Sequence, residues 1–588
     1  MPAPEIALTE RFQSAFAAAF GPEFADADPI IRPSQFADFQ CNAAMGLAKR
    51  LGRKPRDIAQ DILDAVDLTD IAETPEIAGP GFLNIRLRTD WVAAQAAELA
   101  GDERLGAPVP EHADTVVVDY SAPNVAKEMH VGHLRTTVVG DALARTLEKL
   151  GHRVIRQNHI GDWGTPFGML IEHLLEVGED GSEAELLVTD PNAFYQAARA
   201  KFDAAEAAGK AADGSDFASR ARRRVATLQS GDAESLRIWT HLVELSKGYF
   251  HRIYDMLDVT LTDADLAGES TYNDQLESVC ADLEEDGIAR ISDGALCVFP
   301  EGFTGRDEQP LPLIVRKSDG GYGYATTDLA AIRHRVHDLG ADRIAYVVGT
   351  AQELHFQMVF ATARAAGWLP AEVEATHVKI GSVLGEDGKI LRTRSGASLR
   401  LMALLEEATA TARGVIDELR PDLPDDERAS IAHAIGIGGV KYADLSTAHD
   451  SDYTFDLDRM LALTGNTAPY LQYAVARIRS IARKAAAQGI TADGAAPRVE
   501  NDAERALALT LLEYGPTLEQ VGADFEPHRL CAYLFSLAQA FTAFYDASPI
   551  LKESDEQVRA GRLALATLAE RVLVEGLDAL GVRAPQQM

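Results

Sequence analysis

Hydrophobic and polar residues follow several patterns along the chain, and each predicts a different kind of domain. Within residues 1–110, "FQCNAAMGLAKRLGRKPRDIAQDILDAV" has helical spacing and "GPGFLNIRL" predicts a strand after a Pro-Gly turn, which together indicate a small α+β unit. The segment "DTVVVDYSAP" predicts a buried strand that runs into a loop. An amphipathic helix ending at Leu150 and a second strand in "HRVIRQNHIGDWG" follow it. A strand, a long helix and another strand form a parallel βαβ unit, so this region predicts an α/β domain.

The α/β pattern is interrupted and later ends. From about Glu172 to Asp258 the chain has charged, helical spacing, which predicts an insertion, and strand-like segments such as "ADRIAYVVGTAQELHF" return after it. From Leu401 onward almost every segment predicts helix. A chain of 588 residues is too long for one core. We therefore predict an α+β domain (1–110), an α/β domain (111–455) carrying the insertion (about 172–258), and an all-α domain (456–588).

Composition excludes several classes of protein. The chain is 46% hydrophobic and 25% charged, as in ordinary soluble proteins, and no apolar run approaches the roughly 20 residues of a membrane span. The N-terminus has no basic region followed by an apolar core, so no signal peptide is expected. The four cysteines lie far apart without a CxxC pair. These features predict a cytoplasmic protein with no membrane association, no disulfide framework and no structural zinc.

The net charge of −34 argues on average against nucleic-acid binding, but basic residues gather locally. Clusters occur at Lys49–Arg56, at Ser219–Arg224, and at Arg477, Arg479, Arg483 and Lys484. Such clusters can contact phosphates. The alternative for the first cluster is a solvated helix end and loop.

Two histidines three residues apart, His130 and His133, stand at the start of the long helix. They could form a metal site, part of a nucleotide pocket or a helix cap. No third metal ligand stands at useful spacing, and the GxGxxG and P-loop fingerprints are absent from this turn. Gly132 allows a ligand to approach the backbone closely, and a helix N-terminus favours phosphate. A strand before the motif and a long helix after it favour a phosphate site over a chance match.

The stretch "HVGH" resembles the HIGH signature of class I aminoacyl-tRNA synthetases, and "SAPNVAKEMHVGHLRTTVVGDALARTLEKLGHRVIRQNHIGDWGTPFGMLI" resembles the arginyl-tRNA synthetase family in particular. The resemblance extends to "FQCNAAMGLAKRLGRKPRDIAQ", "YATTDLAAIRHR", "YVVGTAQELHF", "TGNTAPYLQYAVARIRSI" and "LGVRAP". It implies a Rossmann-like parallel-sheet catalytic domain, with an N-terminal α+β domain that contacts tRNA and a C-terminal all-α domain that binds the anticodon.

The resemblance also implies the reaction. Arginine attacks the α-phosphorus of ATP, which enters as a complex with Mg²⁺, and the arginyl group then passes to the 3′ end of tRNA(Arg). The family's usual KMSKS loop corresponds to "GEDGKILRTRSGASL", at about 384–398, which lacks the second lysine. The lysine before the HIGH motif, here Lys127, is thought to compensate. The implied catalytic and ATP-binding residues are His130, His133, Lys127, Pro123, Gly132, Lys389 and Arg392, and Arg394 keeps the loop basic.

An arginine substrate calls for carboxylates that match its planar guanidinium. The resemblance assigns this role to Asp119 and Asp328, beside the aromatic Tyr324. It places Ser121, Asn124 and Gln352 around the α-amino and carboxylate ends. Without the resemblance, the alternatives are that Asp328 caps a helix and that Tyr324 belongs to a hydrophobic core.

For tRNA, Tyr470, Tyr473 and Arg477 share one helical face, as stacking on anticodon bases requires; a packed tyrosine seam is the alternative. The other predicted tRNA contacts are Arg479, Lys49 and Arg53. Nothing in the sequence suggests an obligate interface, so a monomer is expected. The rival readings are another class I synthetase (for cysteine or glutamine), an HxGH nucleotidyltransferase, and a tRNA-binding paralogue without activity.

Overall fold

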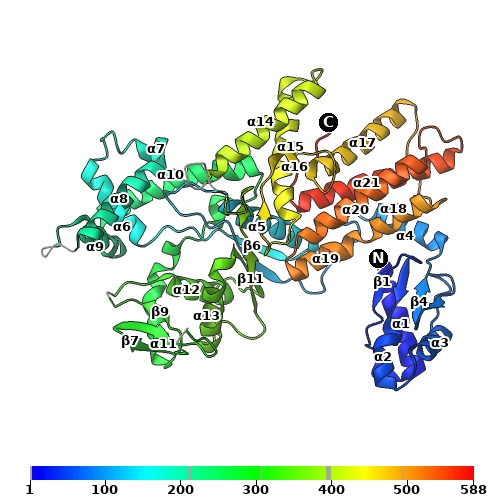
Figure 1. Ribbon diagram of the computed structural model, residues 1–588, viewed down its shortest axis with the longest axis horizontal. Helices are drawn as coiled ribbons and strands as arrows, with labels where there is room; N and C mark the ends of the chain where they lie inside the picture. The colour runs from blue at the N-terminus through cyan, green and yellow to red at the C-terminus, as the bar shows by residue number, and fades with distance from the viewer. Residues whose placement is uncertain (1–2, 210–213, 306–307, 319, 392–398, 493) are drawn as a thin grey trace.

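The computed structural model describes residues 3–209, 214–305, 308–318, 320–391, 399–492 and 494–588. The N-terminal domain is the predicted α+β unit: a four-stranded antiparallel sheet of order β1-β2-β4-β3, packed with helices (Figure 1). Its elements are α1 (Pro4–Phe20), β1 (Ile31–Pro33), β2 (Phe39–Cys41), α2 (Ala43–Leu51), α3 (Pro55–Ala65), β3 (Glu76–Ala78), β4 (Phe82–Ile85) and α4 (Thr89–Gly101). Arg505, from the C-terminal helices, donates to Asp38 and to the Leu87 carbonyl, and these contacts anchor the domain.

The central domain contains a four-stranded parallel sheet of order β11-β10-β5-β6. Its elements are β5 (Thr115–Asp119), α5 (Gly132–Leu150), β6 (Arg153–Gln157), α12 (Tyr324–His337), β10 (Arg343–Gly349), α13 (Glu353–Ala365) and β11 (Glu374–Ile380). Side chains along β5 alternate between two hydrophobic cores. Val116 and Val118 belong to the core that includes residues of α5, and Val117 belongs to the core that includes residues of α12 and α13. Helices therefore cover both faces of the sheet, as the predicted α/β pattern requires.

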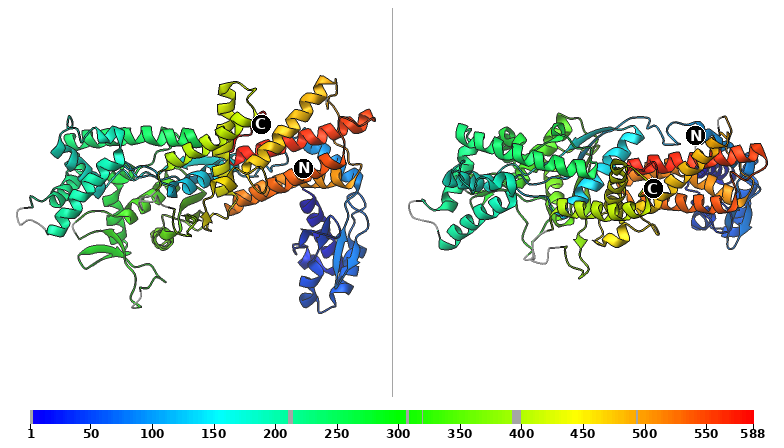
Figure 2. Two further views of the ribbon diagram at one scale, coloured as in Figure 1. Left: turned by 45° about the horizontal axis from the view of Figure 1, so that its top comes forward. Right: turned by 90° about the horizontal axis from the view of Figure 1, so that it is seen from above.

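The predicted helical insertion is present. The described residues between β6 and Asp258 form α6 (Thr165–Val177), α7 (Leu186–Thr189), α8 (Pro191–Ala208), α9 (Phe217–Gln229) and α10 (Ala233–Leu257). They project from the catalytic domain at the end of the molecule opposite the N-terminal domain (Figures 1 and 2). A second subdomain that the sequence pattern did not separate follows. It contains the 3₁₀ segment η3 (Glu269–Gln275), α11 (Leu276–Glu285) and a three-stranded antiparallel sheet of β7 (Ala289–Ser292), β8 (Ala295–Val298) and β9 (Leu313–Arg316).

The chain is almost entirely helical after Leu401, as predicted. The helices are α14 (Leu401–Leu419), α15 (Asp425–Leu445), α16 (Leu457–Met460), α17 (Ala468–Ala487), α18 (Asp502–Leu512), α19 (Tyr514–Asp524), α20 (His528–Ala547) and α21 (Glu556–Ala579). The short strands β12 (Val383–Leu384) and β13 (Tyr453–Thr454) pair in parallel. None of the helices in the described part of the chain is long and apolar enough to cross a membrane.

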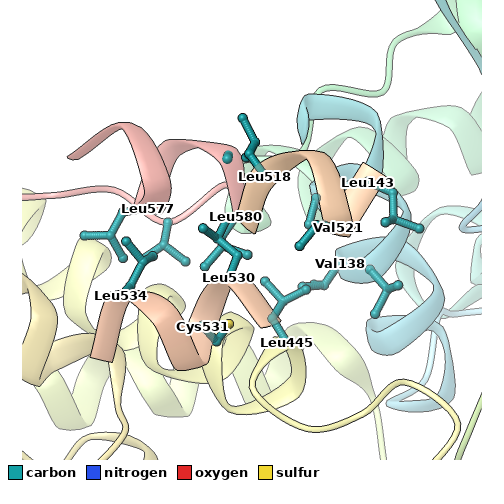
Figure 3. Packing of buried hydrophobic residues seen from close by; sticks show 14 of the residues in the cluster. Val138, Leu143, Leu445, Leu518, Val521, Leu530, Cys531, Leu534, Leu577 and Leu580 are labelled. Atoms are coloured by element: carbon teal, nitrogen blue, oxygen red, sulfur yellow. The ribbon is translucent and has the colours of Figure 1, made fainter. Parts of the chain in front are cut away.

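The signature helix α5 is buried on its far side as well. Val138 and Leu143 of α5 belong to one apolar cluster with residues of the C-terminal helices (Figure 3). The partners labelled there are Leu445 of α15, Leu518 and Val521 of α19, Leu530, Cys531 and Leu534 of α20, and Leu577 of α21 with Leu580 beyond its end. The helix that begins at the histidine pair is therefore held between the sheet and the C-terminal domain.

Candidate active site

The histidine pair stands where β5 and its loop lead into α5, which begins at Gly132. The backbone N–H of His130 donates to Nδ1 of His133 at 3.1 Å, and the N–H of Gly132 donates to Nδ1 of His130 at 3.0 Å. Because both Nδ1 atoms accept hydrogen bonds, the ring proton of each neutral imidazole must lie on Nε2. The local backbone thus presents two adjacent Nε2–H donors, with ring centroids 4.1 Å apart.

Both imidazoles are neutral at physiological pH. Burial lowers the pKa of His133 to about 3, and the charges of His130 and Lys127 contribute. Burial and the charge of Lys127 also lower the pKa of His130. The pair is therefore suited to donating hydrogen bonds to an anion.

A cleft of about 670 Å³ opens beside the pair. It is lined by His130, by Gly132, Arg135 and Thr136 of α5, by the end of β10 at Gly349, and by Asp450 and Asp452 before β13. Parallel-sheet proteins bind ligands beyond the carboxyl ends of their strands, and this cleft occupies that place. Lys389 is exposed in the hairpin that follows β12, while Arg392 and Arg394 lie outside the described residues.

Lys127 takes a different position from the one expected of a phosphate ligand. Its Nζ lies 4.3 Å from the ring centroid of Tyr195, on α8 of the insertion. It lines a small pocket with Leu187, Pro191 and Tyr249. The structure therefore places Lys127 near the histidines but against the insertion.

A second group of predicted site residues lies at the start of α12. Tyr324 and Asp328 stand one helical turn apart at the start of this helix, and Tyr324 is 72% exposed. Asp328 contacts His355 Nε2 at 2.6 Å, so Asp328 does not simply cap the helix. Partial burial and the neighbouring charge of Glu269 raise the pKa of Tyr324.

Glu269 is the residue that the sequence analysis missed. Burial, followed by the negative charges of Asp162 and Asp328, raises its pKa to about 8. Among the described residues no lysine or arginine counters this charge, whereas Asp162 fixes the segment by accepting from Ser270 N–H and Oγ–H. The group formed by Glu269, Asp328 and Tyr324, called the acidic pocket below, has no lysine or arginine partner among the described residues.

Asp119 differs from this pocket, because it already has a partner. At the end of β5 its carboxylate accepts from the buried Arg335 at 2.7 Å, and Arg335 also donates to Gln157. The Arg335 guanidinium lies over the Tyr346 ring. The role of Asp119 beside Asp328 at a substrate guanidinium stays a prediction, and the structure adds that Asp119 already pairs with an internal arginine.

The loop from Ser121 to Ala126 leads from the end of β5 toward the histidine pair. Ser121, Ala122 and Ala126 have positive φ angles of 70°, 48° and 57°, a strained backbone for residues with a Cβ. The Ser121 hydroxyl is buried against Tyr254 and Thr137. Asn124 is exposed and stands over Gly161, where a Cβ would approach its Oδ1 to 2.5 Å. Pro123 is buried in the loop, and Gln352 is exposed at the start of α13.

The predicted tRNA residues divide into exposed and internal groups. On α17, Tyr473 is 49% exposed, Tyr470 packs on Phe535, and the Arg477 guanidinium lies 4.0 Å from the Tyr545 ring. Arg479 instead donates to Glu570 and to the carbonyls of Ala584 and Pro585, so it ties down the C-terminal tail.

Two of the predicted basic clusters have acidic partners. In the N-terminal domain Lys49 is exposed, and Arg53 pairs with Asp61. Within Ser219–Arg224, Arg220 and Arg224 pair with Glu172, and Arg222 pairs with Glu206. This cluster therefore holds the insertion together more than it offers a basic surface.

The described residues contain no group of three or more histidine, cysteine or acidic side chains arranged to hold a metal ion. All four cysteines are buried and unpaired.

The parallel sheet, the paired imidazoles at the start of α5 and the adjoining cleft define a class I aminoacyl-tRNA synthetase. The family described as "tRNA synthetases class I (R), catalytic domain" matches residues 96–457. "Arginyl tRNA synthetase N terminal domain" matches residues 7–87, and "DALR anticodon binding domain" matches residues 471–588.

Similar proteins give the same assignment. The chain is 65% identical to an arginine–tRNA ligase of Thermobifida fusca over 585 residues, covering 100% of both chains, and 50% identical to one of Frankia casuarinae, covering 96% of both. Among solved structures the chain resembles the arginyl-tRNA synthetase of Plasmodium falciparum, with a TM-score of 0.85 and 27% identity over 100% of both chains. It also resembles that of Thermus thermophilus, with a TM-score of 0.79 and 26% identity over 99% of both chains. The chain belongs to the arginyl-tRNA synthetases, which confirms the family, fold class and ligase activity predicted from the sequence.

Proposed function

We propose that this enzyme recognises L-arginine through Asp328, Glu269 and Tyr324, forms arginyl-adenylate with ATP in the cleft beside His130 and His133, and transfers the arginyl group to tRNA(Arg). The observation that carries the proposal is the acidic pocket, which holds Glu269 and Asp328 together without a lysine or arginine partner among the described residues. A guanidinium supplies the missing positive charge and several donors in one plane.

In this proposal the adenylate forms where the arginine carboxylate meets ATP in the cleft beside the histidine pair. The arginine carboxylate attacks the α-phosphorus of ATP, an oxygen–phosphorus bond forms, and the bond to the β-phosphate breaks, releasing pyrophosphate. The Nε2–H groups of His130 and His133 stabilise the phosphate charge that grows during transfer. Mg²⁺ enters with ATP, bound mainly by phosphate oxygens and water, and Asp450 and Asp452 add carboxylates to the cleft wall.

The other predicted ligands keep their proposed roles. Asn124 and Gln352 are exposed, and in this proposal they bind the α-amino and carboxylate ends of arginine, while Ser121 fixes the loop that carries Asn124. Pro123 and Gly132 give ATP a close approach to the backbone, while Lys389 and Arg392 supply charge from the 384–398 loop. Lys127 provides the cation that the KMSKS-equivalent loop lacks.

For tRNA we propose three contact regions: the N-terminal domain (1–110) through Lys49 and Arg53, the catalytic domain (111–455), and the helical domain (456–588) through Tyr470, Tyr473 and Arg477. The exposed face of Tyr473 supports stacking on an unpaired base. We assign Arg479 an indirect role, because its donors are used within the protein. The enzyme works as a cytoplasmic monomer in this proposal.

Arginine binding should release a proton. Because the pKa of Glu269 is about 8 in the free enzyme, an entering guanidinium displaces its proton at neutral pH. Arginine affinity should therefore rise with pH, by up to about tenfold per unit below pH 8, and level off above it. Calorimetry in buffers of different ionisation enthalpy measures the proton release. Glu269→Gln should bind more weakly and show no such slope; a flat affinity between pH 6 and 8 in the unmodified enzyme would contradict the assignment.

Activation should depend on tRNA. The phosphate site lacks the loop lysine, so it stays incomplete until tRNA binds. ATP–pyrophosphate exchange with each amino acid, with and without tRNA(Arg), tests the whole proposal: we expect exchange with arginine and tRNA together. Exchange with another amino acid would reject the arginine pocket, and fast arginine-dependent exchange without tRNA would reject the incomplete phosphate site.

A further inference from the structure

We propose that Tyr195, on helix α8 of the insertion, is a positioning residue that holds Lys127 away from the nucleotide cleft until tRNA binds. The inference rests on the proposed role of Lys127 as the cation that replaces the missing loop lysine. It adds a second reason for tRNA dependence, one located in the insertion.

Lys127 is close to the phosphate site but faces elsewhere. Its charge contributes to the lowered pKa of both His130 and His133, which shows that the ammonium lies near the pair. Yet its Nζ lies 4.3 Å from the centroid of the Tyr195 ring. Among the described residues, Lys127 is not one of those that line the cleft. Rotation of the flexible lysine side chain would be needed to carry the charge to a bound phosphate.

A second contact fixes α8 on the same loop. Asp190 caps the start of α8 by accepting from the Ala193 N–H, and it also faces Arg400 at 3.4 Å. Arg400 forms an ion pair of 2.8 Å with Glu128, the neighbour of Lys127. Lys127 and Glu128 are thus both held to the first turns of α8, one directly and one through Arg400.

Arg400 also belongs to a backbone pairing with the signature segment. The Val131 N–H donates to the Leu399 carbonyl at 3.1 Å, and the Leu401 N–H donates to the Met129 carbonyl at 3.0 Å. Residues 399–401 directly follow the KMSKS-equivalent loop. A shift of this segment when substrates bind would therefore move the support of α8, and Tyr195 with it.

The hold on Lys127 is weak enough to be reversed. A cation over an accessible aromatic ring is stabilised by an amount that corresponds to about two- to fivefold in an equilibrium. Tyr195 is half-buried, so its ring is not sealed inside the core of the insertion. A contact of this size biases Lys127 toward the insertion without preventing its release.

Replacement of the ring tests the proposal. Tyr195→Leu should raise the residual arginine-dependent pyrophosphate exchange without tRNA about two- to fivefold, and change the rate with saturating tRNA less than twofold. Tyr195→Phe is the matched control, because it keeps the aromatic face, and it should behave as the unmodified enzyme. An unchanged or lower rate without tRNA in a folded Tyr195→Leu enzyme would overturn the proposal.

The Lys127→Ala background separates this inference from the proposed function. If Lys127→Ala alone leaves the exchange rate with tRNA unchanged, the proposed role of Lys127 fails. If that variant loses activity but Tyr195→Leu still raises the residual rate within it, Tyr195 acts through another group and only the positioning inference fails. Loss of the Tyr195→Leu effect in the Lys127→Ala background supports it.

A second measurement uses the enzyme with Tyr195 unchanged, so it tests the proposal even if the Tyr195→Leu variant does not fold. After reductive ¹³C-methylation of the lysines, the Lys127 signal, assigned from Lys127→Arg, should show an upfield ring-current shift in the free enzyme and lose it when tRNA(Arg) binds. A Lys127 signal at the ordinary position in the free enzyme, or one that keeps its shift with tRNA bound, would overturn the proposal.

Discussion

Replacing Asp328 with asparagine should weaken arginine binding roughly a hundredfold and leave ATP binding unchanged. The substitution removes a charge-assisted partner of the guanidinium and leaves Glu269 as the only carboxylate of the acidic pocket. Hydrogen bonds to charged groups are worth about 1.5–3 kcal/mol, and the upper part of this range applies to a half-buried site. Binding of canavanine, whose guanidino group has the same planar donors, should weaken by a similar factor. Equilibrium binding of arginine, canavanine and ATP measures the three effects.

The control is Asp338→Asn, which changes the exposed C-cap residue of the same helix, paired with His334, and should bind arginine normally. The same pocket should make the unmodified enzyme reject lysine about 10⁴-fold in kcat/KM, because one ammonium leaves a buried carboxylate partly unpaired. Unchanged arginine affinity in Asp328→Asn, or ready charging with lysine, would show that the guanidinium binds elsewhere.

Lys127→Ala should lower the rate of arginine activation about a hundredfold while arginine affinity changes little. The lysine contact is made to phosphate charge that develops in the transition state, and loss of such a contact costs about 3 kcal/mol. Single-turnover adenylate formation in the presence of tRNA gives the rate, and equilibrium binding gives the affinity.

A suitable comparison is Lys247→Ala, which removes a lysine paired with Glu244 on α10 and should retain the normal rate. If Lys127→Ala reacts within about threefold of the unmodified enzyme, another group supplies the positive charge. The basic residues of the 384–398 loop would then be the first candidates.

Local sequence patterns predicted the parts of the fold that depend on local spacing. The helix from Gly132 to Leu150 and the parallel pairing of β5 with β6 follow from apolar periodicity and a short connection. Arg479 was predicted together with the tRNA contacts, although two residues after Arg477 the helix has turned by about 200°, away from the face of Tyr470, Tyr473 and Arg477. The structure shows that separation, with Arg479 turned toward Glu570.

The arginine pocket could not be predicted in the same way. Arg335 meets Asp119 across 216 positions of sequence, so no local pattern announces that Asp119 is already neutralised. Glu269 begins a 3₁₀ segment without helical or strand periodicity, and its significance arises only from folding beside Asp162 and Asp328. The short stretch "GESTY", with a lone acid among small polar residues, was the only local signal.

The burial of α5 on both sides limits how this protein can be divided and recombined. Its Val138 and Leu143 share one core with α15, α19, α20 and α21, the first of which begins only at Asp425, so the catalytic sheet and α5 have no finished surface of their own there. Gly522 of α19 approaches Leu150 so closely that an added Cβ would lie 2.4 Å from its Cδ1. Interiors packed to this density tolerate little change in shape. A chimaera that joins this catalytic domain to the anticodon domain of a relative must therefore carry over both sides of the contact, or neither.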